Sequence, residues 1–207
     1  MVYNKRSSKG IRISKRVLVL CEGESEKAYV LGYRSDDINR RRLAAVDVEV
    51  YQPTNYSPYG LLKEAERKVK EAKRDGFPYD LVWIVFDKDN HQHIPKTFSE
   101  ADGLKISIAF SSISFETWIL LHFAKTARCF QNANEIIRYI ENKYGFALTK
   151  TNYFKSLTEA QKSSALANAK WLKSQNNQDI CSGKPVYECC AFTNFDDLIK
   201  YLSTLNQ

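Results

Sequence analysis

The sequence predicts an α/β fold: a mostly parallel sheet flanked by helices, with a largely helical carboxyl-terminal half. Short apolar runs, which are typical of buried strands, alternate with segments of helical periodicity as far as Phe110. Beyond Phe110, apolar residues recur mainly at helical spacing. Because strands that alternate with helices are joined by crossover connections, neighbouring strands are expected to run parallel.

Four segments have the pattern of strands. Residues 17–21 and 80–86 are short apolar runs, and 104–110 alternates polar with apolar side chains. Residues 46–51 alternate as well, which is typical of a strand near the edge of a sheet. The strands are therefore expected to lie in the first half of the chain.

The helical segments carry start and stop signals of known physical origin, such as side-chain N-caps and glycines that end helices. Residues 90–103 instead predict a loop with a short helix after Pro95. The predicted helices are one from Ser25, its N-cap, to about Tyr33; 59–74, closed by Asp75 and Gly76; 115–123, capped by Ser114; 133–144, ended by Gly145; one from the capping box at Thr158 to about Leu172; and a last helix after Asn194.

These patterns divide the chain into three parts that form a single compact domain. Residues 1–14 are polar and basic, and they are expected to be flexible. Residues 15–125 form the α/β core. Residues 126–207 form a helical extension that is expected to pack on the core.

Composition limits the classes of partner. The formal net charge of +7 and the pI near 9.1 favour a polyanion such as nucleic acid, although a basic tail and a solvated helix end would explain the same charge. No apolar run approaches the roughly 20 residues that span a bilayer, and no signal-peptide core is present. The protein is therefore expected to be soluble and cytoplasmic, without a membrane partner.

The five cysteines have no spacing that is typical of a zinc site. They form no CxxC pair, and their number is odd. In a reducing compartment the simplest interpretation is five free thiols, so no disulfide is expected.

Acidic residues follow two of the predicted strands. Glu22 comes directly after the first strand, and Asp87 and Asp89 come after the third. A carboxylate at the end of a buried strand is costly for packing alone, and the carboxyl ends of parallel strands are where ligands bind in such folds. Residues two apart on an extended chain point to the same side. The sequence therefore predicts that Glu22, Asp87 and Asp89 hold Mg²⁺ or Mn²⁺, whose preferred ligands are oxygens.

Other side chains could support this site. Glu116 stands in an apolar helix, where an unpaired carboxylate is costly, so we expect a metal, a site-organising role or a salt bridge. His91 follows the aspartates closely enough to ligate a metal or move protons, and Lys88 and Lys27 could contact phosphate. His122 could support the site too, although a hydrogen-bonded histidine in the core is the favoured interpretation.

Three blocks of the sequence resemble those of RloB-like proteins, in the same order, over roughly residues 15–205. They are residues 18–24 together with Glu26, residues 85–89, and residues 114–123. That family is similar to the Toprim fold, so the resemblance implies a Toprim-like sheet in which Glu22 is the conserved glutamate and Asp87 and Asp89 are the metal-binding pair. The sequence departs from the pattern at Asn90 and His91, where many Toprim domains place a glycine, and at Ser25, where the family often has threonine.

The resemblance implies an activity and partners. It implies a metal-dependent nuclease acting on DNA or RNA in prokaryotic anti-phage or abortive-infection defence, with catalytic roles for Glu22, Asp87, Asp89 and Glu116. Nucleic acid is then the partner, and another defence protein such as an ATPase could be a further one; the oligomeric state stays open. A non-catalytic nucleic-acid-binding or partner-docking module is the main alternative, and a glycosyltransferase that uses Asp87 and Asp89 is a third.

Overall fold

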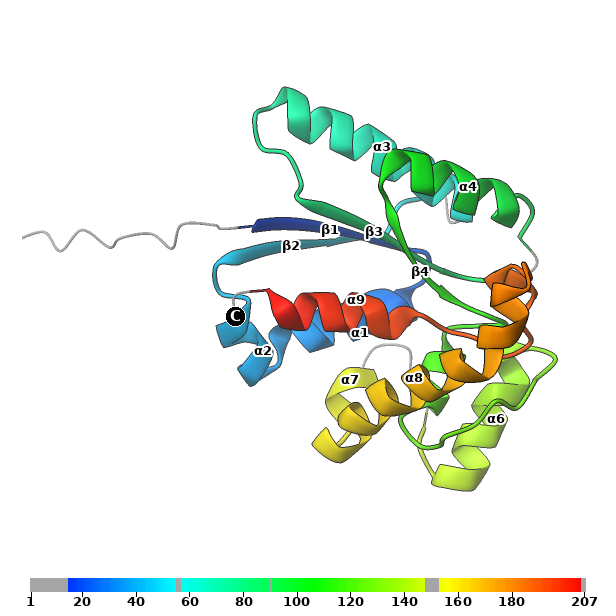
Figure 1. The fold of residues 1–207 in the computed structure, drawn as a ribbon. Helices are drawn as coiled ribbons and strands as arrows, with labels where there is room; N and C mark the ends of the chain where they lie inside the picture. The colour runs from blue at the N-terminus through cyan, green and yellow to red at the C-terminus, as the bar shows by residue number, and fades with distance from the viewer. Residues whose placement is uncertain (1–14, 55–56, 90, 148–152, 206–207) are drawn as a thin grey trace, which may run out of the picture.

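The computed structural model of the chain describes residues 15–54, 57–89, 91–147 and 153–205. A sheet of four parallel strands in the order β2-β1-β3-β4 forms its centre (Figure 1). The predicted α/β class is confirmed, and the predicted segment 1–14 lies outside the described residues. The strands are β1 (Lys15–Cys21), β2 (Val46–Tyr51), β3 (Leu81–Asp87) and β4 (Ser107–Ser111).

Helices cover both faces of the sheet, as Figure 1 shows. The helices α3 and α4 lie on one face, and α1 and α9 lie on the other, where α5 to α8 extend beyond the sheet. The helices are α1 (Glu24–Ser35), α2 (Asp37–Arg42), α3 (Pro58–Arg74), α4 (Ile94–Leu104), α5 (Glu116–Leu120), α6 (Ala133–Tyr144), α7 (Tyr153–Ser156), α8 (Glu159–Cys181) and α9 (Phe195–Thr204), with a 3-10 turn η1 (Val186–Glu188).

The strand side chains alternate between two apolar cores, because successive residues of a strand point to opposite faces. Val17 and Val19 of β1 belong to the core beneath α1 and α9, and Leu18 and Leu20 belong to the core beneath α3 and α4. The first core also contains buried residues of α6 and α8. Both faces of β1 are thus buried, which explains its continuous apolar sequence.

Several predicted elements match the structure. The strand β2 lies at the edge of the sheet, as its alternating pattern predicts. Gly145 follows α6 with a left-handed backbone (φ +64°), and the capping box of α8 is formed by Thr158 and Gln161. The two helix-end features are local, so short stretches of sequence were sufficient to predict them.

Other boundaries differ from the predictions. Gly23, and not Ser25, is the N-cap of α1, and α5 has only five residues, with Phe115 rather than Ser114 as its N-cap. The segment expected to be mostly loop forms the 11-residue helix α4, and α8 continues to Cys181. Tertiary packing decides these ends, since the intrinsic preference of single residues for helix is weak.

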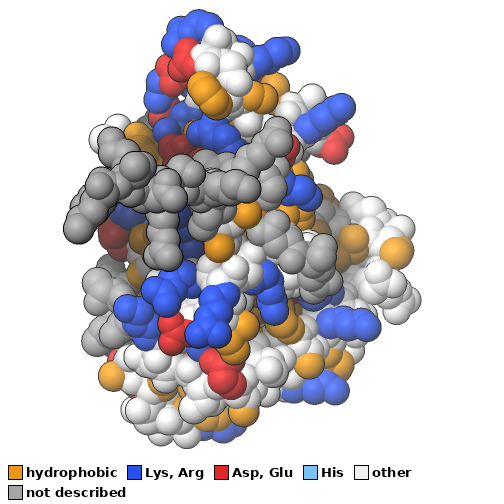
Figure 2. Space-filling model, turned by 90° about the vertical axis from the view of Figure 1, so that its left-hand side faces the viewer, with side chains coloured by type: hydrophobic (Ala, Val, Ile, Leu, Met, Phe, Trp, Pro, Cys, Tyr) orange, Lys and Arg blue, Asp and Glu red, His pale blue; other side chains and the backbone are white. Residues whose placement is uncertain are grey.

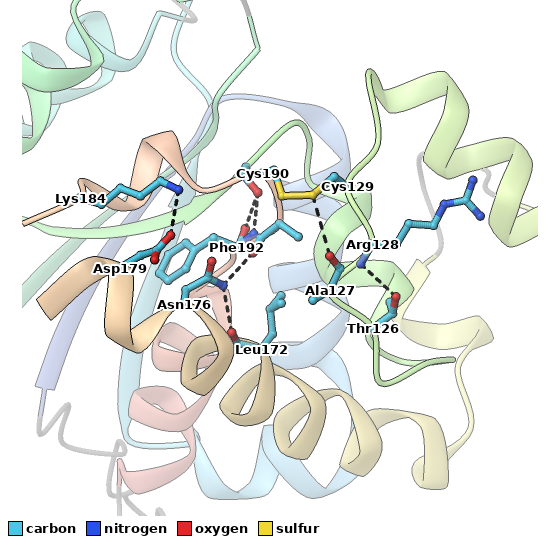
Figure 3. The surroundings of a disulfide bond; sticks show 12 residues. Thr126, Ala127, Arg128, Cys129, Leu172, Asn176, Asp179, Lys184, Cys190 and Phe192 are labelled. Atoms are coloured by element: carbon cyan, nitrogen blue, oxygen red, sulfur yellow. Dashed lines mark hydrogen bonds and ion pairs between the residues drawn. A yellow bond between two sulfur atoms is a disulfide. The ribbon is translucent and has the colours of Figure 1, made fainter. Parts of the chain in front are cut away.

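The prediction of five free thiols is wrong in this structure, because Cys129 and Cys190 form a disulfide (Figure 3). It joins the loop after α5 to the segment before α9. Asn176 of α8 holds the second segment, since its side-chain amide donates hydrogen bonds to the carbonyls of Leu172 and Ala191. The two cysteines are separated by 61 positions, so their proximity could not be seen in the sequence.

Charge is mixed over the end of the molecule that carries α2 and the amino ends of the strands. Figure 2 shows Lys and Arg side chains spread over this end, with Asp and Glu side chains between them. The positive net charge is therefore not gathered into one uninterrupted patch there. None of the helices in the described ranges is long and apolar enough to pass through a membrane.

Candidate metal centre

The parallel register brings two acidic residues together at the carboxyl end of the sheet. Cys21 of β1 lies opposite Val85 of β3, so Glu22 follows β1 beside the last residues of β3. The backbone N–H of Glu22 continues the ladder by donating to the carbonyl of Val85 at 2.9 Å. The Oε2 atom of Glu22 accepts a hydrogen bond of 3.3 Å from the backbone N–H of Asp87. The predicted convergence of Glu22 and Asp87 is therefore present in the fold.

His91 completes a three-residue cluster with these two acids. Glu22, Asp87 and His91 each offer one ligand atom, and the three atoms lie within 4.8 Å of one another. His91 Nε2 contacts Glu22 Oε1, and their side chains are only 21% and 14% exposed. The same Nε2 atom is buried and has no hydrogen-bond partner among the residues that the structure describes. The histidine ring is thus held in contact with the Glu22 carboxylate, without the geometry of a hydrogen bond.

Asp89 does not lie beside Asp87 on the same side of the strand, although the sequence pattern predicted that it would. The strand β3 ends at Asp87, and Asp89 has a left-handed backbone (φ +25°), so the two aspartates do not follow one extended chain. Asp89 and Lys88 are exposed, and Asp89 does not belong to the three-residue cluster. Its charge still acts on the cluster, because it raises the pKa of both Glu22 and Asp87. Asp89 therefore lies at the rim of the site.

Burial and mutual repulsion raise the pKa values of the acids. Burial raises the pKa of Asp87 to about 9, and neighbouring carboxylates add to the shift. Burial raises the pKa of Glu22 to about 8 against the opposing hydrogen bond from Asp87, and Asp89 adds to the shift. The carboxylates that repel Asp87 are those of Glu22, Glu26, Asp89 and Glu116. A bound cation would relieve this repulsion.

Glu26 lies behind the cluster at the start of α1. Its carboxylate accepts hydrogen bonds from the backbone N–H groups of Gly23 and Glu26 itself, so it satisfies free donors at the helix end. Burial raises its pKa to about 7, and the charges of Glu22 and Glu116 add to the shift. A Cβ atom on Gly23 would lie 2.5 Å from Glu26 Oε2. Glycine therefore leaves space for the Glu26 carboxylate; its backbone conformation (φ −114°) is open to any residue.

Glu116 is the first residue of α5 and is almost fully buried. Its charge raises the pKa of Asp87 and Glu26, so it faces the same cluster. No salt bridge to Glu116 is found within the described ranges; instead its side chain interacts with the Tyr153 hydroxyl. Asp87 is tied to the start of α5 as well, since the N–H of Phe115 donates to Asp87 Oδ2 at 3.3 Å.

Tyr153 is a site residue that the sequence did not indicate. It is 2% exposed, and its hydroxyl interacts with Ser25 and Glu116. Burial raises its pKa to about 12, the bond to Ser25 opposes this, and the charge of Glu116 adds to it. Tyr153 lies in the four-residue helix α7, which has no motif that would predict a position beside the acids.

A groove of about 800 Å³ opens onto these acids. One wall comes from the start of α1 and from β3, and the other comes from the segment after Cys129 together with Cys189 and Cys190. The disulfide therefore joins two segments of the second wall. Acidic side chains dominate the charged lining of the groove; they are Glu24, Glu26, Asp87, Asp89 and Glu116, against the single cation Lys88 in the described lining.

His122 does not belong to this groove. It is 2% exposed, its Nε2 lies 2.9 Å from the Tyr29 hydroxyl, and its Nδ1 lies 3.1 Å from the carbonyl of Trp118. Burial lowers its pKa to about 4, which favours the neutral ring. The favoured interpretation as a hydrogen-bonded core histidine describes its position, and the structure gives it no contact with the metal cluster.

The donor set fits a hard divalent cation. Two half-buried carboxylates with raised pKa values and one half-buried imidazole, whose Nε2 atom is buried without a hydrogen-bond partner, converge at the ends of two adjacent strands. Carboxylate oxygens suit Mg²⁺ and Mn²⁺, and an imidazole nitrogen favours Mn²⁺ over Mg²⁺. Asp89, Glu26 and Glu116 would add negative charge around the ion without direct ligation in this arrangement.

Comparison with known proteins gives one result that covers most of the chain. A family model described as RloB-like protein matches residues 17–202. The matched range includes every residue of the cluster and both walls of the groove. No curated protein matches the chain significantly.

Proposed function

The chain belongs to the RloB-like protein family, and from this premise we propose that it is a Mg²⁺- or Mn²⁺-dependent nuclease that hydrolyses phosphodiester bonds of DNA or RNA. The convergence of Glu22, Asp87 and His91 within 4.8 Å supports this proposal most directly. Carboxylates that repel one another in a partly buried site destabilise the fold. A bound divalent cation would offset that repulsion.

The position of each residue suggests its role in the proposed reaction. Glu22, Asp87 and His91 would hold the cation, which supplies a Lewis acid that polarises the phosphate and lowers the pKa of the attacking water. Glu22 would alternatively accept the proton of that water, because its pKa is raised to about 8. Lys88 is exposed at the groove and would contact the phosphate.

Glu116 and Tyr153 would help to hold the metal-binding side chains in position. Their interaction fixes the acid of α5 behind Asp87, and the Phe115 N–H fixes the Asp87 carboxylate itself. The Phe115 contact would orient Asp87 and the Tyr153 contact would orient Glu116 before any ligand binds, which is how supporting side chains improve a metal site.

A cleavage assay tests the proposal. Purified protein is incubated with end-labelled single-stranded and duplex DNA and RNA in Mn²⁺, Mg²⁺ or EDTA. We expect metal-dependent cleavage that falls at least 100-fold in Glu22→Gln and Asp87→Asn, as in other sites that lose a required group. The matched control is Asp102→Asn, an exposed carboxyl at the end of α4, which should cleave at the wild-type rate.

Two results would overturn the proposal. Cleavage that persists at the wild-type rate in both Glu22→Gln and Asp87→Asn would place the activity elsewhere. Binding of nucleic acid without cleavage of any substrate, with or without metal, would favour the alternative of a non-catalytic module.

The biological setting is part of the proposal. Family resemblance supports a role in prokaryotic anti-phage defence, in the cytoplasm, with nucleic acid as the substrate and an ATPase or another defence protein as a partner. Co-purification with the products of neighbouring genes would test the partner, and loss of phage protection in Asp87→Asn would test the role.

A further inference from the structure

A second groove, of about 610 Å³, lies along the outer side of α1. Its charged lining is mainly basic: Lys27, Arg34 and Arg40 come from α1 and α2, Lys155 comes from α7, and Glu24 is the acid. We infer that this groove, called the α1 groove below, binds the phosphates of a nucleic-acid strand that leads into the carboxylate groove. The inference rests on the proposed function and extends it to a substrate-binding surface.

The two grooves share a lining residue at the start of α1. Glu24 lines both of them, and Lys27, which lines the α1 groove, follows Glu24 by about one helical turn. The helix α1 has 12 residues and is therefore roughly 18 Å long, which corresponds to about five nucleotides of a strand in B-form DNA. A strand with one phosphate at the metal cluster would thus lay its following phosphates along the basic side chains.

Three cations of the α1 groove have either a weak, exposed ion pair or no ion pair among the described residues. Lys155 is exposed and forms no ion pair within the described part of the chain. Among the described residues, Lys27 forms an ion pair with the exposed Glu24, at 3.9 Å. Arg40 is paired with the exposed Asp37 at 3.4 Å. Exposed pairs of this kind contribute little to stability, so phosphates could replace them at small cost.

Arg34 and Leu31 add to the same surface. One N–H of the Arg34 guanidinium donates to the carbonyl of Val48 at 2.8 Å, which anchors the side chain and leaves its other donors available. Leu31 lines the α1 groove and is 39% exposed, an apolar position that a sugar or base could cover. The groove thus combines an anchored arginine, cations with weak or no ion pairs, and an exposed apolar side chain.

The packing of α7 on α1 sets the position of Lys155. Gly32 allows this packing, because a Cβ atom there would lie 2.7 Å from the Cβ of Phe154. Phe154 is buried between the helices, and Lys155 follows it at the mouth of the groove. The short helix α7 therefore contributes Tyr153 to the acidic cluster and Lys155 to the basic surface.

Salt-dependent binding tests the inference without requiring cleavage. A fluorescent 20-nucleotide single strand, as DNA and as RNA, is titrated with protein in EDTA at several NaCl concentrations, and fluorescence anisotropy gives Kd. In Lys27→Gln/Lys155→Gln we expect Kd to rise about tenfold and the magnitude of the negative slope of log K against log salt to fall by about 1.4, as two lost phosphate contacts to a single strand require. The matched control, Lys70→Gln/Lys73→Gln on α3, should retain the wild-type Kd and slope.

Two controls exclude a defect in folding as the cause of weaker binding: a double variant that preserves both charges, and thermal melting of the variants. Lys27→Arg/Lys155→Arg keeps both positive charges and should restore binding to within about twofold. A wild-type slope in the glutamine pair, an equal loss in the α3 control, or no restoration by arginine would each overturn the inference.

The outcomes separate this inference from the proposed function. Metal-dependent cleavage together with an unchanged salt slope in Lys27→Gln/Lys155→Gln overturns the α1 groove alone. The expected change in slope without cleavage by the wild type overturns the nuclease alone. A wild type that binds neither strand overturns both.

Discussion

The Oε2 atom of Glu22 lies 3.3 Å from the backbone nitrogen of Asp87 and accepts its hydrogen bond. This contact joins the ends of two adjacent parallel strands and places both carboxylates beside His91. The hydrogen bond that Glu22 accepts favours its charged carboxylate, so it opposes the rise that burial causes in the pKa of Glu22. The fold therefore holds together acid groups that repel each other.

The raised pKa values predict how stability depends on pH when no metal is present. The folded protein holds protons on Glu22, Glu26 and Asp87 up to about pH 8, 7 and 9, whereas the same groups in the unfolded chain lose them near pH 4. The folded state then binds more protons between these limits, so the free energy of unfolding falls as pH rises from about 4 to about 9. Each such group contributes a slope of up to about 1.4 kcal/mol per pH unit.

Urea unfolding in EDTA at a series of pH values measures this dependence. Asp87→Asn should flatten the slope and should be more stable than the wild type near pH 9. Saturating Mn²⁺ should also flatten it, because the cation replaces the protons. A stability that rises with pH across this window in the wild type without metal would contradict the assigned burial of the acids.

Gly23→Ala tests the close approach of the Glu26 carboxylate to the turn after β1. The added methyl would meet Glu26 Oε2 at 2.5 Å, so the buried carboxylate must move away from the N–H groups that it accepts from. We expect a loss of about 1–3 kcal/mol of stability, which is typical of overpacking, and weaker metal binding. Thermal unfolding and a Mn²⁺ titration measure the two effects.

Gly103→Ala is the matched control for this change. Gly103 lies in α4, and a Cβ atom there meets no other atom within 4 Å. Alanine should stabilise the helix by up to about 1 kcal/mol and leave metal binding unchanged. Equal behaviour of the two variants would show that Gly23 does not make room for Glu26.

The disulfide should contribute measurably to stability. It closes a loop between positions 61 apart, for which the loop-entropy argument gives about 4 kcal/mol. Cys129→Ser should therefore unfold at lower urea concentration than the wild type under oxidising conditions, and a dithiol reductant should remove the difference. Cys181→Ser changes an exposed free thiol and serves as the control.

Thiol counting gives an independent check of the disulfide. The unfolded, unreduced wild type should show three reactive thiols, those of Cys21, Cys181 and Cys189. Five thiols under non-reducing conditions would contradict the disulfide and restore the interpretation made from the sequence.

The sheet and the pairing of Glu22 with Asp87 could be predicted from the sequence because both depend on short-range patterns. Apolar runs mark buried strands, and the end of each run fixes where its carboxylate lies. The position of Asp89 could not be predicted, since the chain leaves the extended form at the end of β3 and takes a positive φ at that residue. The change of backbone, which moves Asp89 to the rim, has no clear sequence signal.

Contacts between distant parts of the chain account for the rest of what the sequence did not reveal. Tyr153 reaches Glu116 across 37 positions through the packing of α7 on α1, which Gly32 permits. The helix α4 was expected only as a short helix after Pro95, because Pro95 and Gly103 are typical of loops, yet Pro95 occupies the first turn of α4, where its missing N–H costs nothing. Long-range packing of this kind is not encoded in any one segment.

Direct measurement of Mn²⁺ binding tests the central claim that Glu22, Asp87 and His91 form a metal site. Isothermal titration of the metal-free protein should give saturable binding, weakened at least about tenfold in Asp87→Asn and in His91→Ala. Asp102→Asn should bind as the wild type does. Absence of binding by the wild type, or equal affinity in Asp87→Asn and the wild type, would contradict the account.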